Sequence, residues 1–293
     1  MAKWLLRSLS AGACVLIGQG LVLGQTGAQD EAVAGMDQPA GVVVPEAAPS
    51  SKWTVSLGYD YASHFVVYGA DVWGGGDDFF GSDSTSFVWA DFSVDLDPFK
   101  LKFGIWGDVN DNADDSVGGS IQEVDVYIGL SYTIDRFTLG VSYLEWYYAS
   151  DEERMVDFTV SFDDSDLWFD GFALNPSFTA HIRVDGNGDQ DEAAAFVFGV
   201  KPEFQLTEGR YGLTLSIPAS VAFFTDDFHG GDSGFGYASI GATLGMPLAF
   251  IPSEYGEWSA AANLTYYITD EDAIPGNVEE NFLTGTLSIS TTF

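Results

Sequence analysis

The sequence predicts an all-β protein, a closed antiparallel up-and-down transmembrane β-barrel of about 12 strands. Three observations predict this fold. Apolar and polar residues alternate within segments that cover most of the chain. Short and long connections between these segments follow one another along the chain, and the long connections are strongly acidic. Because successive side chains of a strand point to opposite faces, each such segment has one oily face and one polar face.

The first residues have the layout of a secretory signal, with basic residues before an apolar run and small residues around Ala28. We expect a signal peptide over residues 1–28, cleaved after Ala28, with cleavage after Ala34 as the weaker alternative. An uncleaved anchor is disfavoured because a spanning helix needs about 20 apolar residues. The only cysteine, Cys14, lies in this segment. A lipid attached to Cys14 is a weaker alternative. With cleavage after Ala28, the mature protein is expected to contain no cysteine and therefore no disulfide.

Residues 29–50 are rich in Ala, Pro and acidic residues without periodicity, and we expect a disordered leader there. Residues 51–293 are expected to form the barrel as one domain. Alternation predicts its strands over residues 52–69, 84–97, 98–109, 119–134, 136–149, 153–162, 172–184, 193–206, 210–222, 235–249, 256–269 and 281–293.

Two architectures produce alternation of this kind. In IQEVDVYIGLSYT, for example, Val124 and Val126 face one side and Glu123 and Asp125 face the other. A soluble β-sandwich turns the oily face inward, whereas a membrane barrel turns it toward lipid and the polar face toward a lumen. Periodicity does not choose between them, and the sandwich remains the alternative fold.

The connections favour the barrel. DLDP, IDR and TEGR are tight turns, whereas the six long connections include ADVWGGGDDFFGSD, DVNDNADDSVG and DEDAIPGNVEE. Together the six long ones hold 23 acidic residues and no Lys or Arg. Outer-membrane barrels show this asymmetry, with short periplasmic turns and longer external loops. Two connections, DDSDLWFDG and IPSEYGE, are longer than this scheme expects.

The last segment, NFLTGTLSISTTF, has one oily face and one mostly hydroxyl face. We expect it to pair with the first strand, because an unpaired edge in hydrocarbon is costly. An aromatic end after alternating apolar residues also resembles the C-terminal signature by which bacterial outer-membrane barrels are recognised for assembly. Phe293 is therefore the expected assembly signal, and the barrel-assembly machinery an expected partner. Gly285 and Thr291 stand where that signature prefers bulkier apolar residues.

Three motifs in the first half of the mature chain, GYDYASHFVVYGADVW, VWADFSVDLD and EVDVYIGLSYTID, carry a family likeness. Over about Trp53 to Tyr148 the chain resembles an uncharacterised family of bacterial outer-membrane, porin-like β-barrels with an aromatic-rich N-terminal strand motif. Members open with an aromatic strand, a polar turn and an aromatic-Arg-Gly element. Here Val67-Tyr68-Gly69 stands in place of Arg-Gly. The resemblance implies an outer-membrane location and no particular activity.

The polar faces supply a set of mixed charge that we expect to line the lumen. It comprises Asp60, Asp91, Asp95, Lys100, Lys102, Glu123, Asp125, Asp157, His181, Arg183 and Lys201. These residues could form a ladder of ion pairs that fills a narrow barrel, or a polar conduit. Twelve strands fall between filled eight-stranded barrels and open porins of 16 to 18 strands, so both interpretations stand. Outward aromatic residues, including Trp53, Tyr59 and Tyr237, are expected to form interfacial girdles.

The acidic external loops are a second candidate site. The acidic residues expected in these loops are Asp77, Asp78, Asp114, Asp115, Asp185, Asp189, Asp191, Asp226, Asp227, Asp270, Glu271 and Asp272. Such loops could bind divalent cations loosely. The most calcium-like stretch, DGNGDQDE, has Gln190 and Phe196 where an EF-hand needs Gly and Glu, so we expect no dedicated metal site. No cofactor is expected.

The histidines could indicate a lipid hydrolase built into the barrel wall. The three, His64, His181 and His229, are not accompanied by a GxSxG motif. We expect ordinary lumen or loop histidines and no enzyme, with the hydrolase as the least favoured alternative.

The leading functional hypothesis is an outer-membrane, porin-like channel for passive diffusion of small polar or cationic solutes, with acidic loops that enrich cations at its mouth. The competing hypothesis is a non-transporting surface, structural or adhesive barrel whose loops bind divalent cations. Outer-membrane lipid is an expected partner of either. Nucleic acid is not, because the formal charge of −34 repels phosphates.

Overall fold

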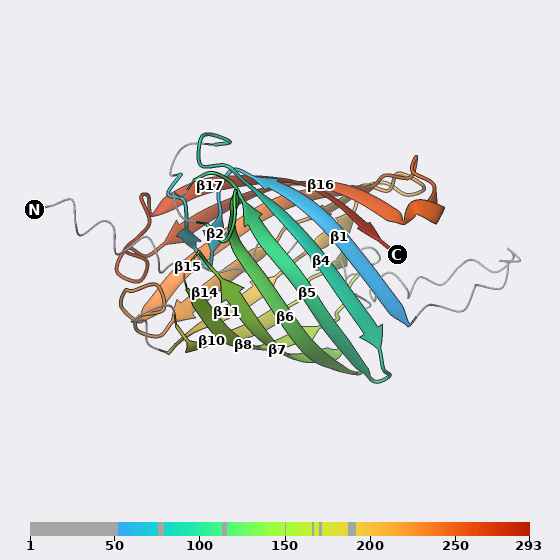
Figure 1. Ribbon diagram of the computed structural model, residues 1–293. Coiled ribbons are helices and arrows are strands. Elements are labelled where there is room, and N and C mark those ends of the chain that lie inside the picture. Colours follow the sequence, from blue (N-terminus) through green and yellow to red (C-terminus); the bar gives the residue numbers. More distant parts are fainter. Residues whose placement is uncertain are drawn as a thin grey trace, which may run out of the picture.

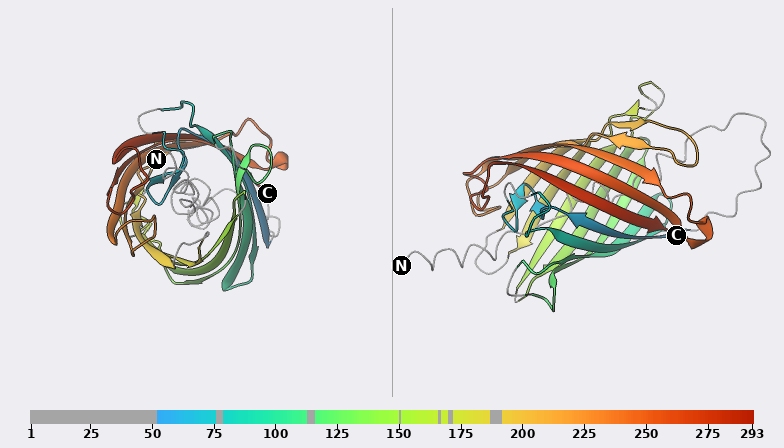
Figure 2. Two further views of the ribbon diagram at one scale, coloured as in Figure 1. Left: turned by 60° about the vertical axis from the view of Figure 1, so that its left-hand side comes forward. Right: turned by 90° about the horizontal axis from the view of Figure 1, so that it is seen from above.

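The computed structural model describes residues 52–75, 79–112, 116–149, 151–165, 167–169, 172–186 and 192–293. The expected signal peptide, the leader and Ser51 lie outside these ranges. Within them, one antiparallel sheet of 12 strands closes on itself. Figure 1 shows the tilted strands, and the left view of Figure 2 looks into the barrel. No helix in the described ranges is long and apolar enough to cross a membrane.

The wall follows the predicted up-and-down order. Its strands are β1 (Trp53–Ala62), β4 (Thr85–Asp95), β5 (Phe99–Val109), β6 (Ile121–Ile134), β7 (Phe137–Tyr147), β8 (Glu152–Phe162), β10 (Ser177–Asp185), β11 (Ala193–Val200), β14 (Ala219–Phe224), β15 (Gly234–Pro247), β16 (Glu257–Thr269) and β17 (Asn281–Thr292). Each strand pairs with its neighbour in this order, and β14–β15 and β1–β17 complete the ring.

Three wall strands are interrupted by prolines. The short strands β9 (Phe172–Ala173), β12 (Glu203–Gln205) and β13 (Thr214–Ser216) continue β10, β11 and β14 across Pro176, Pro202 and Pro218. Proline has no backbone N–H to donate, so the ladder breaks there and resumes beyond it. A single 3₁₀ turn, η2 (Ser253–Tyr255), lies in the β15–β16 connection.

The outer face of the wall is apolar. On β17 the side chains of Leu283, Leu287 and Ile289 are exposed, while the alternate Thr and Ser residues face the interior. This inversion of the soluble pattern runs around the barrel and identifies it as transmembrane. The predicted fold class is confirmed, and the soluble sandwich is excluded because the sheet closes without a second, packed sheet.

The seam between the first and last strands closes the ring. β1 and β17 pair from Ser56–Thr292 to Ala62–Thr286, and Val55 and Phe293 exchange backbone hydrogen bonds of 3.2 and 2.9 Å. Gly285 lies just beyond. A Cβ there would stand 2.5 Å from the Phe79 ring, so the glycine admits an aromatic residue that a larger side chain would exclude.

Two sequence-based expectations about the wall are wrong. The first strand ends at Ala62 and not near residue 69, because the chain turns inward and forms a separate hairpin of β2 (Val66–Val67) and β3 (Ala70–Asp71). Tyr237, expected to face outward, is 0% exposed. Tyr237 has the same parity as Gly241 and Thr243, which lie on the inner face of β15, so regular alternation along the strand places it inside.

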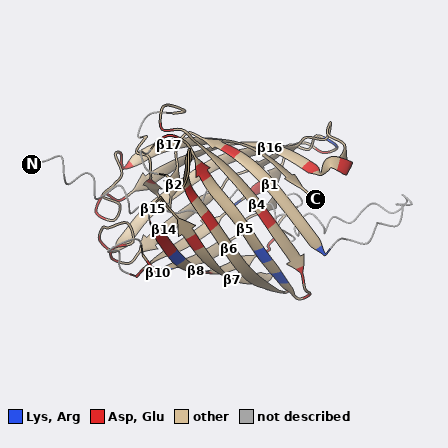
Figure 3. Cartoon of the chain, viewed as in Figure 1, with Lys and Arg blue, Asp and Glu red and all other residues tan. Residues whose placement is uncertain are grey.

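Charge is distributed unevenly over the molecule. Acidic residues outnumber basic ones on the strands and in the connections (Figure 3). On the outer face of β7 and β8, Arg154 forms ion pairs with Glu145, Glu152 and Asp185. Such charged groups mark the edge of the lipid-facing band, because ionised side chains at the bilayer midplane are costly.

Deleting residues 281–293 should prevent barrel formation, because β1 and β16 would be left with unpaired edges. The check is compact, heat-modifiable migration on gels after refolding into detergent micelles. As a control, Phe293→Ala keeps the backbone pair with Val55 and removes an exposed side chain. It should change the free energy of unfolding by less than about 1 kcal/mol. A truncated chain that still folds would contradict closure through this seam.

Candidate functional site: a hairpin folded into the barrel lumen

The inner wall toward the short turns is lined by small and hydroxyl side chains. Cross-strand pairs include Ser220–Ser239 and Ser259–Ser290, each with 2.8 Å between hydroxyl oxygens. Asn263 Nδ2 donates to the Thr243 hydroxyl over 2.7 Å. Because hydroxyl groups both donate and accept, such a surface can hydrogen-bond to water or to a polar solute.

The sequence-predicted lumen residues fall into three groups. Near the short turns lie the ion pairs Lys100–Asp95 (3.6 Å), Lys102–Asp91 (3.2 Å) and Lys201–Glu203 (3.0 Å), in which only Asp91 is buried. Midway, Asp60 accepts a hydrogen bond of 3.0 Å from the Trp89 indole. Toward the long connections, five predicted residues are buried: Glu123, Asp125, Asp157, His181 and Arg183.

The β2–β3 hairpin occupies the interior at the end where the long connections lie (Figure 1, Figure 2). Every residue from Ser63 to Asp71 is buried. Its tip, Tyr68-Gly69, has positive φ angles of 44° and 85°, as a tight hairpin turn requires. The run from Phe65 to Tyr68 is apolar on both faces, so it packs on all sides and could not lie in a half-polar wall.

The tip of the hairpin contacts the part of the wall between β10 and β15. The Tyr68 ring lies 4.7 Å from the His181 ring and 5.5 Å from the Phe228 ring, centroid to centroid. A Cβ at Gly69 would stand 2.7 Å from Tyr237 on β15. The stem is held by Phe65, whose ring is 5.5 Å from Trp106. The hairpin is thus clamped between opposite walls.

His181 supports the tip with a buried polar pair. Its Nδ1 lies 2.5 Å from Asp157 Oδ1, and its ring stacks on Trp146 at 5.2 Å. The neighbouring Arg183 donates to the backbone oxygens of Phe228 (3.0 Å) and Asp227 (2.8 Å). Arg183 therefore holds the β14–β15 connection against the hairpin.

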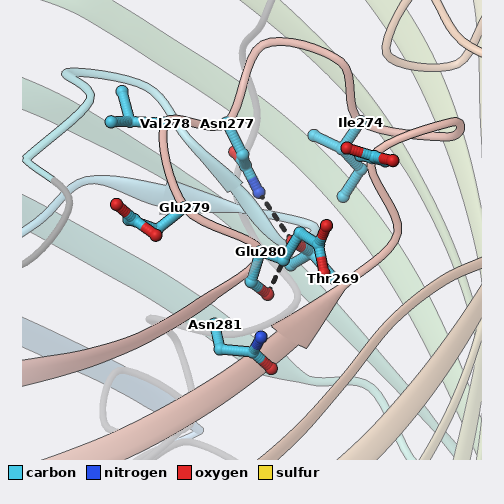
Figure 4. Close-up of a pocket in the computed structure, with 8 residues that line it drawn as sticks. Thr269, Ile274, Asn277, Val278, Glu279, Glu280 and Asn281 are labelled. Carbon is cyan, nitrogen blue, oxygen red and sulfur yellow. Dashed lines mark hydrogen bonds between the residues drawn. The ribbon is translucent and has the colours of Figure 1, made fainter.

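The β16–β17 connection holds the hairpin in place from the rim of the barrel. Asn277 Nδ2 donates to the Gly69 oxygen (2.9 Å) and to the Thr269 hydroxyl (3.1 Å), and its Oδ1 accepts from the Asp71 amide (2.8 Å). Asn277 also borders a pocket of about 310 Å³ at the rim, shown in Figure 4, with Glu271, Glu279 and Glu280 around it.

Several acidic loop residues serve local structure. Asp226 accepts from the Ser233 amide, Asp270 accepts from the Asp272 amide, and Asp185 pairs with Arg154. Six predicted residues, Asp77, Asp78, Asp114, Asp115, Asp189 and Asp191, lie outside the described ranges. Among the residues that the structure describes, no three acidic, His or Cys side chains are placed to hold a metal ion.

The geometry around His64 bears on the hydrolase alternative. Ser63 Oγ lies 2.9 Å from His64 Nδ1 and accepts a hydrogen bond from the Gly285 amide. The two residues are only 0% and 3% exposed. A nucleophile needs both an activating base and access to substrate, and this pair has no access in the observed arrangement.

The sequence did not indicate the other residues of this site. Phe65, Tyr68 and Trp106 were assigned to strands by alternation alone, and Asn277 lies in a loop 208 residues from Gly69. The available signal was the apolar run FVVY, which breaks the alternation of the first segment.

The fold and interior define a transmembrane β-barrel whose polar lumen is crossed by a hairpin. No protein-family model matches the chain, and no curated protein matches it. It is similar to an outer-membrane channel from Pseudomonas putida F1, at 12% identity and TM-score 0.49, over 85% of this chain and 100% of that chain. It is also similar to LpxR from Salmonella typhimurium (10% identity, TM-score 0.43, 81% and 100% covered) and to a Pseudomonas aeruginosa FadL homologue (11%, 0.37, 83% and 90%). No activity is transferred from these likenesses.

The β14–β15 connection should loosen at acidic pH. Burial lowers the pKa of His229 to about 3; a hydrogen bond to the Tyr68 backbone opposes this, and the Arg183 charge adds to it. The unfolded chain binds this proton below about pH 6.5 while the folded chain does not. The contribution of His229 to the free energy of unfolding is therefore fully present above pH 6.5 and is lost as the pH falls toward 3.

The variant His229→Gln cannot titrate and isolates this effect. Between pH 7 and pH 4, the free energy of unfolding of the native protein should fall by about 3 kcal/mol more than that of the variant. Urea titration in micelles measures the free energy of unfolding of the native protein and of the variant. The contributions of the carboxylates, which are the same in both proteins, cancel in the comparison. Parallel pH profiles would show that His229 is hydrated in the folded protein.

Proposed function

We propose that the protein is an outer-membrane channel for passive diffusion of small polar solutes, with the hairpin restricting its passage at the end of the long connections. The observation that carries the proposal is the hydroxyl, glycine and amide lining of the inner wall between the short turns and the hairpin. A barrel that served only as an anchor would gain more stability from an interior of packed apolar side chains.

The chemistry of the lining suits neutral polar solutes. Where charges occur near the short turns, they are compensated in pairs such as Lys102–Asp91 and Lys201–Glu203. A solute can therefore exchange hydrogen bonds with water for bonds with Ser and Thr hydroxyls along its route. Weak, repeated contacts of this kind permit both entry and release.

Net charge adds a preference for cations. The chain carries a formal charge of −34, and its long connections are acidic. A negative mouth raises the local concentration of cations, and the effect weakens as salt screens it. The outer-membrane location is supported by the closed up-and-down barrel with an apolar outer face, the type that spans bacterial outer membranes.

The alternative of a non-transporting structural barrel is favoured by one observation, the aromatic packing of the hairpin across the lumen. We propose no catalysis, because Ser63 and His64 are enclosed. Conductance measurements separate a channel from a structural barrel.

Gly245 and Leu244 offer a matched test on β15. Gly245 shares the inward parity of Thr243 and has open space where its Cβ would stand, whereas Leu244 is exposed to lipid. In planar bilayers the native protein should conduct, and Gly245→Trp should lower the unitary conductance by roughly half or more. The control Leu244→Trp should leave it unchanged. A native protein with no conductance, or equal effects of the two variants, would contradict transport through the lumen.

A further inference from the structure

Behind the hairpin, the inner wall carries a row of alternating tryptophan and acidic residues. Trp106 on β5 pairs in register with Asp125 on β6, Asp125 with Trp146 on β7, and Trp146 with Glu153 on β8. One step closer to the long connections, Asp108 lies opposite Glu123. We call Asp108, Glu123, Asp125 and Glu153 the carboxyl row.

The carboxyl row is enclosed, and two of its members, Asp125 and Glu153, are poorly compensated. Asp125 is 0% exposed and its carboxyl lies against the carboxyl of Glu123; Glu153 is 1% exposed, and its Oε1 has no hydrogen-bond partner. The carboxyls of Glu123, Glu153 and Asp108 are the electrostatic neighbours of Asp125. The Arg183 charge acts on Glu153, and this guanidinium also donates to two backbone oxygens.

The hairpin is what separates this row from water on the lumen side. Phe65 packs on Trp106 and Phe87, and the Trp73 indole donates to Asp108 over 3.1 Å. Two opposing effects therefore act on the stability of the inserted hairpin. Burial of its aromatic rings stabilises the inserted position. Exclusion of water from Asp125, which faces other carboxyls, and from Glu153, whose Oε1 has no partner, destabilises it.

Such opposition is characteristic of an element with two accessible positions. We propose that the hairpin of residues 63–75 is a gate, and that the carboxyl row behind it is the cation filter of the open channel. The inference rests on the proposed transport function and assigns its solute class, small hydrated cations. Withdrawal of the hairpin hydrates the row, and hydrated Asp and Glu are ionised at neutral pH. Four carboxylates then line this part of the passage, with the Arg183 guanidinium beside Glu153.

The test begins with a variant that releases the gate. Phe65→Ala combined with Tyr68→Ala removes the two aromatic anchors of the hairpin without changing the wall. In planar bilayers with a KCl gradient, this variant should conduct more than the native protein, and its reversal potential should show preference for K⁺ over Cl⁻. If the double variant fails to fold, Asn277→Ala, which removes the latch at the rim, serves in its place.

The filter is tested in the released background. Adding Asp125→Asn and Glu153→Gln should preserve conductance and lower the K⁺/Cl⁻ permeability ratio by about threefold or more. Glu152→Gln is the matched control, because Glu152 precedes Glu153 on β8 but is exposed on the outer face. It should leave the ratio unchanged.

The outcomes separate the two levels of the proposal. A folded, released variant that conducts no ions overturns the transport function itself. A released variant that conducts no more than the native protein overturns the gate. Conductance with an unchanged permeability ratio after removal of both carboxylates, or an equal change with Glu152→Gln, overturns the filter.

Discussion

The whole structure depends on the pairing of every backbone N–H and C=O in a wall that faces hydrocarbon. An unpaired group there costs several kcal/mol, so the sheet has to close. Closure between β1 and β17 fixes which side chains face lipid, because alternation leaves one parity for each side. The same constraint accounts for two local features. The hydrogen-bond ladder resumes beyond each of Pro176, Pro202 and Pro218, and Gly285 leaves room for Phe79 beside the β1–β17 seam.

Inside the ring, two kinds of chemistry divide the lumen. Toward the short turns the wall is built from hydroxyls and small residues, which tolerate water. Toward the long connections it is built from Trp, Phe and carboxyl groups that meet the hairpin. Aromatic packing around Phe65 and Tyr68 favours insertion of the hairpin, and the enclosed acids oppose it. A hairpin that opens and closes reversibly needs these two free-energy contributions to be nearly equal, because neither the inserted nor the withdrawn position is then strongly preferred.

The period-two pattern was sufficient to predict the wall. Parity placed Asp60, Asp91 and His181 on the polar face, and the predicted strand ranges agree with the structure to within a few residues at most ends. It could not predict the hairpin, because an apolar run such as FVVY reads as a strand buried on both faces. Contacts between Gly69 and Asn277 depend on closure of the entire ring and leave no local trace in the sequence. The outward expectation for Tyr237 was wrong for a different reason, because this residue shares the parity of Thr243 and alternation alone places it on the inner face.

The central claim is that the hydroxyl face borders water and the apolar face borders lipid. Adjacent residues on β17 test it directly, since Ser288 faces the lumen and Leu287 is exposed on the outer face. Single cysteines at these two positions of the mature protein, reconstituted in lipid vesicles, can be probed with a small, charged thiol reagent. The account predicts rapid modification at position 288 and protection at position 287. Protection at 288, or rapid modification at 287, would contradict it.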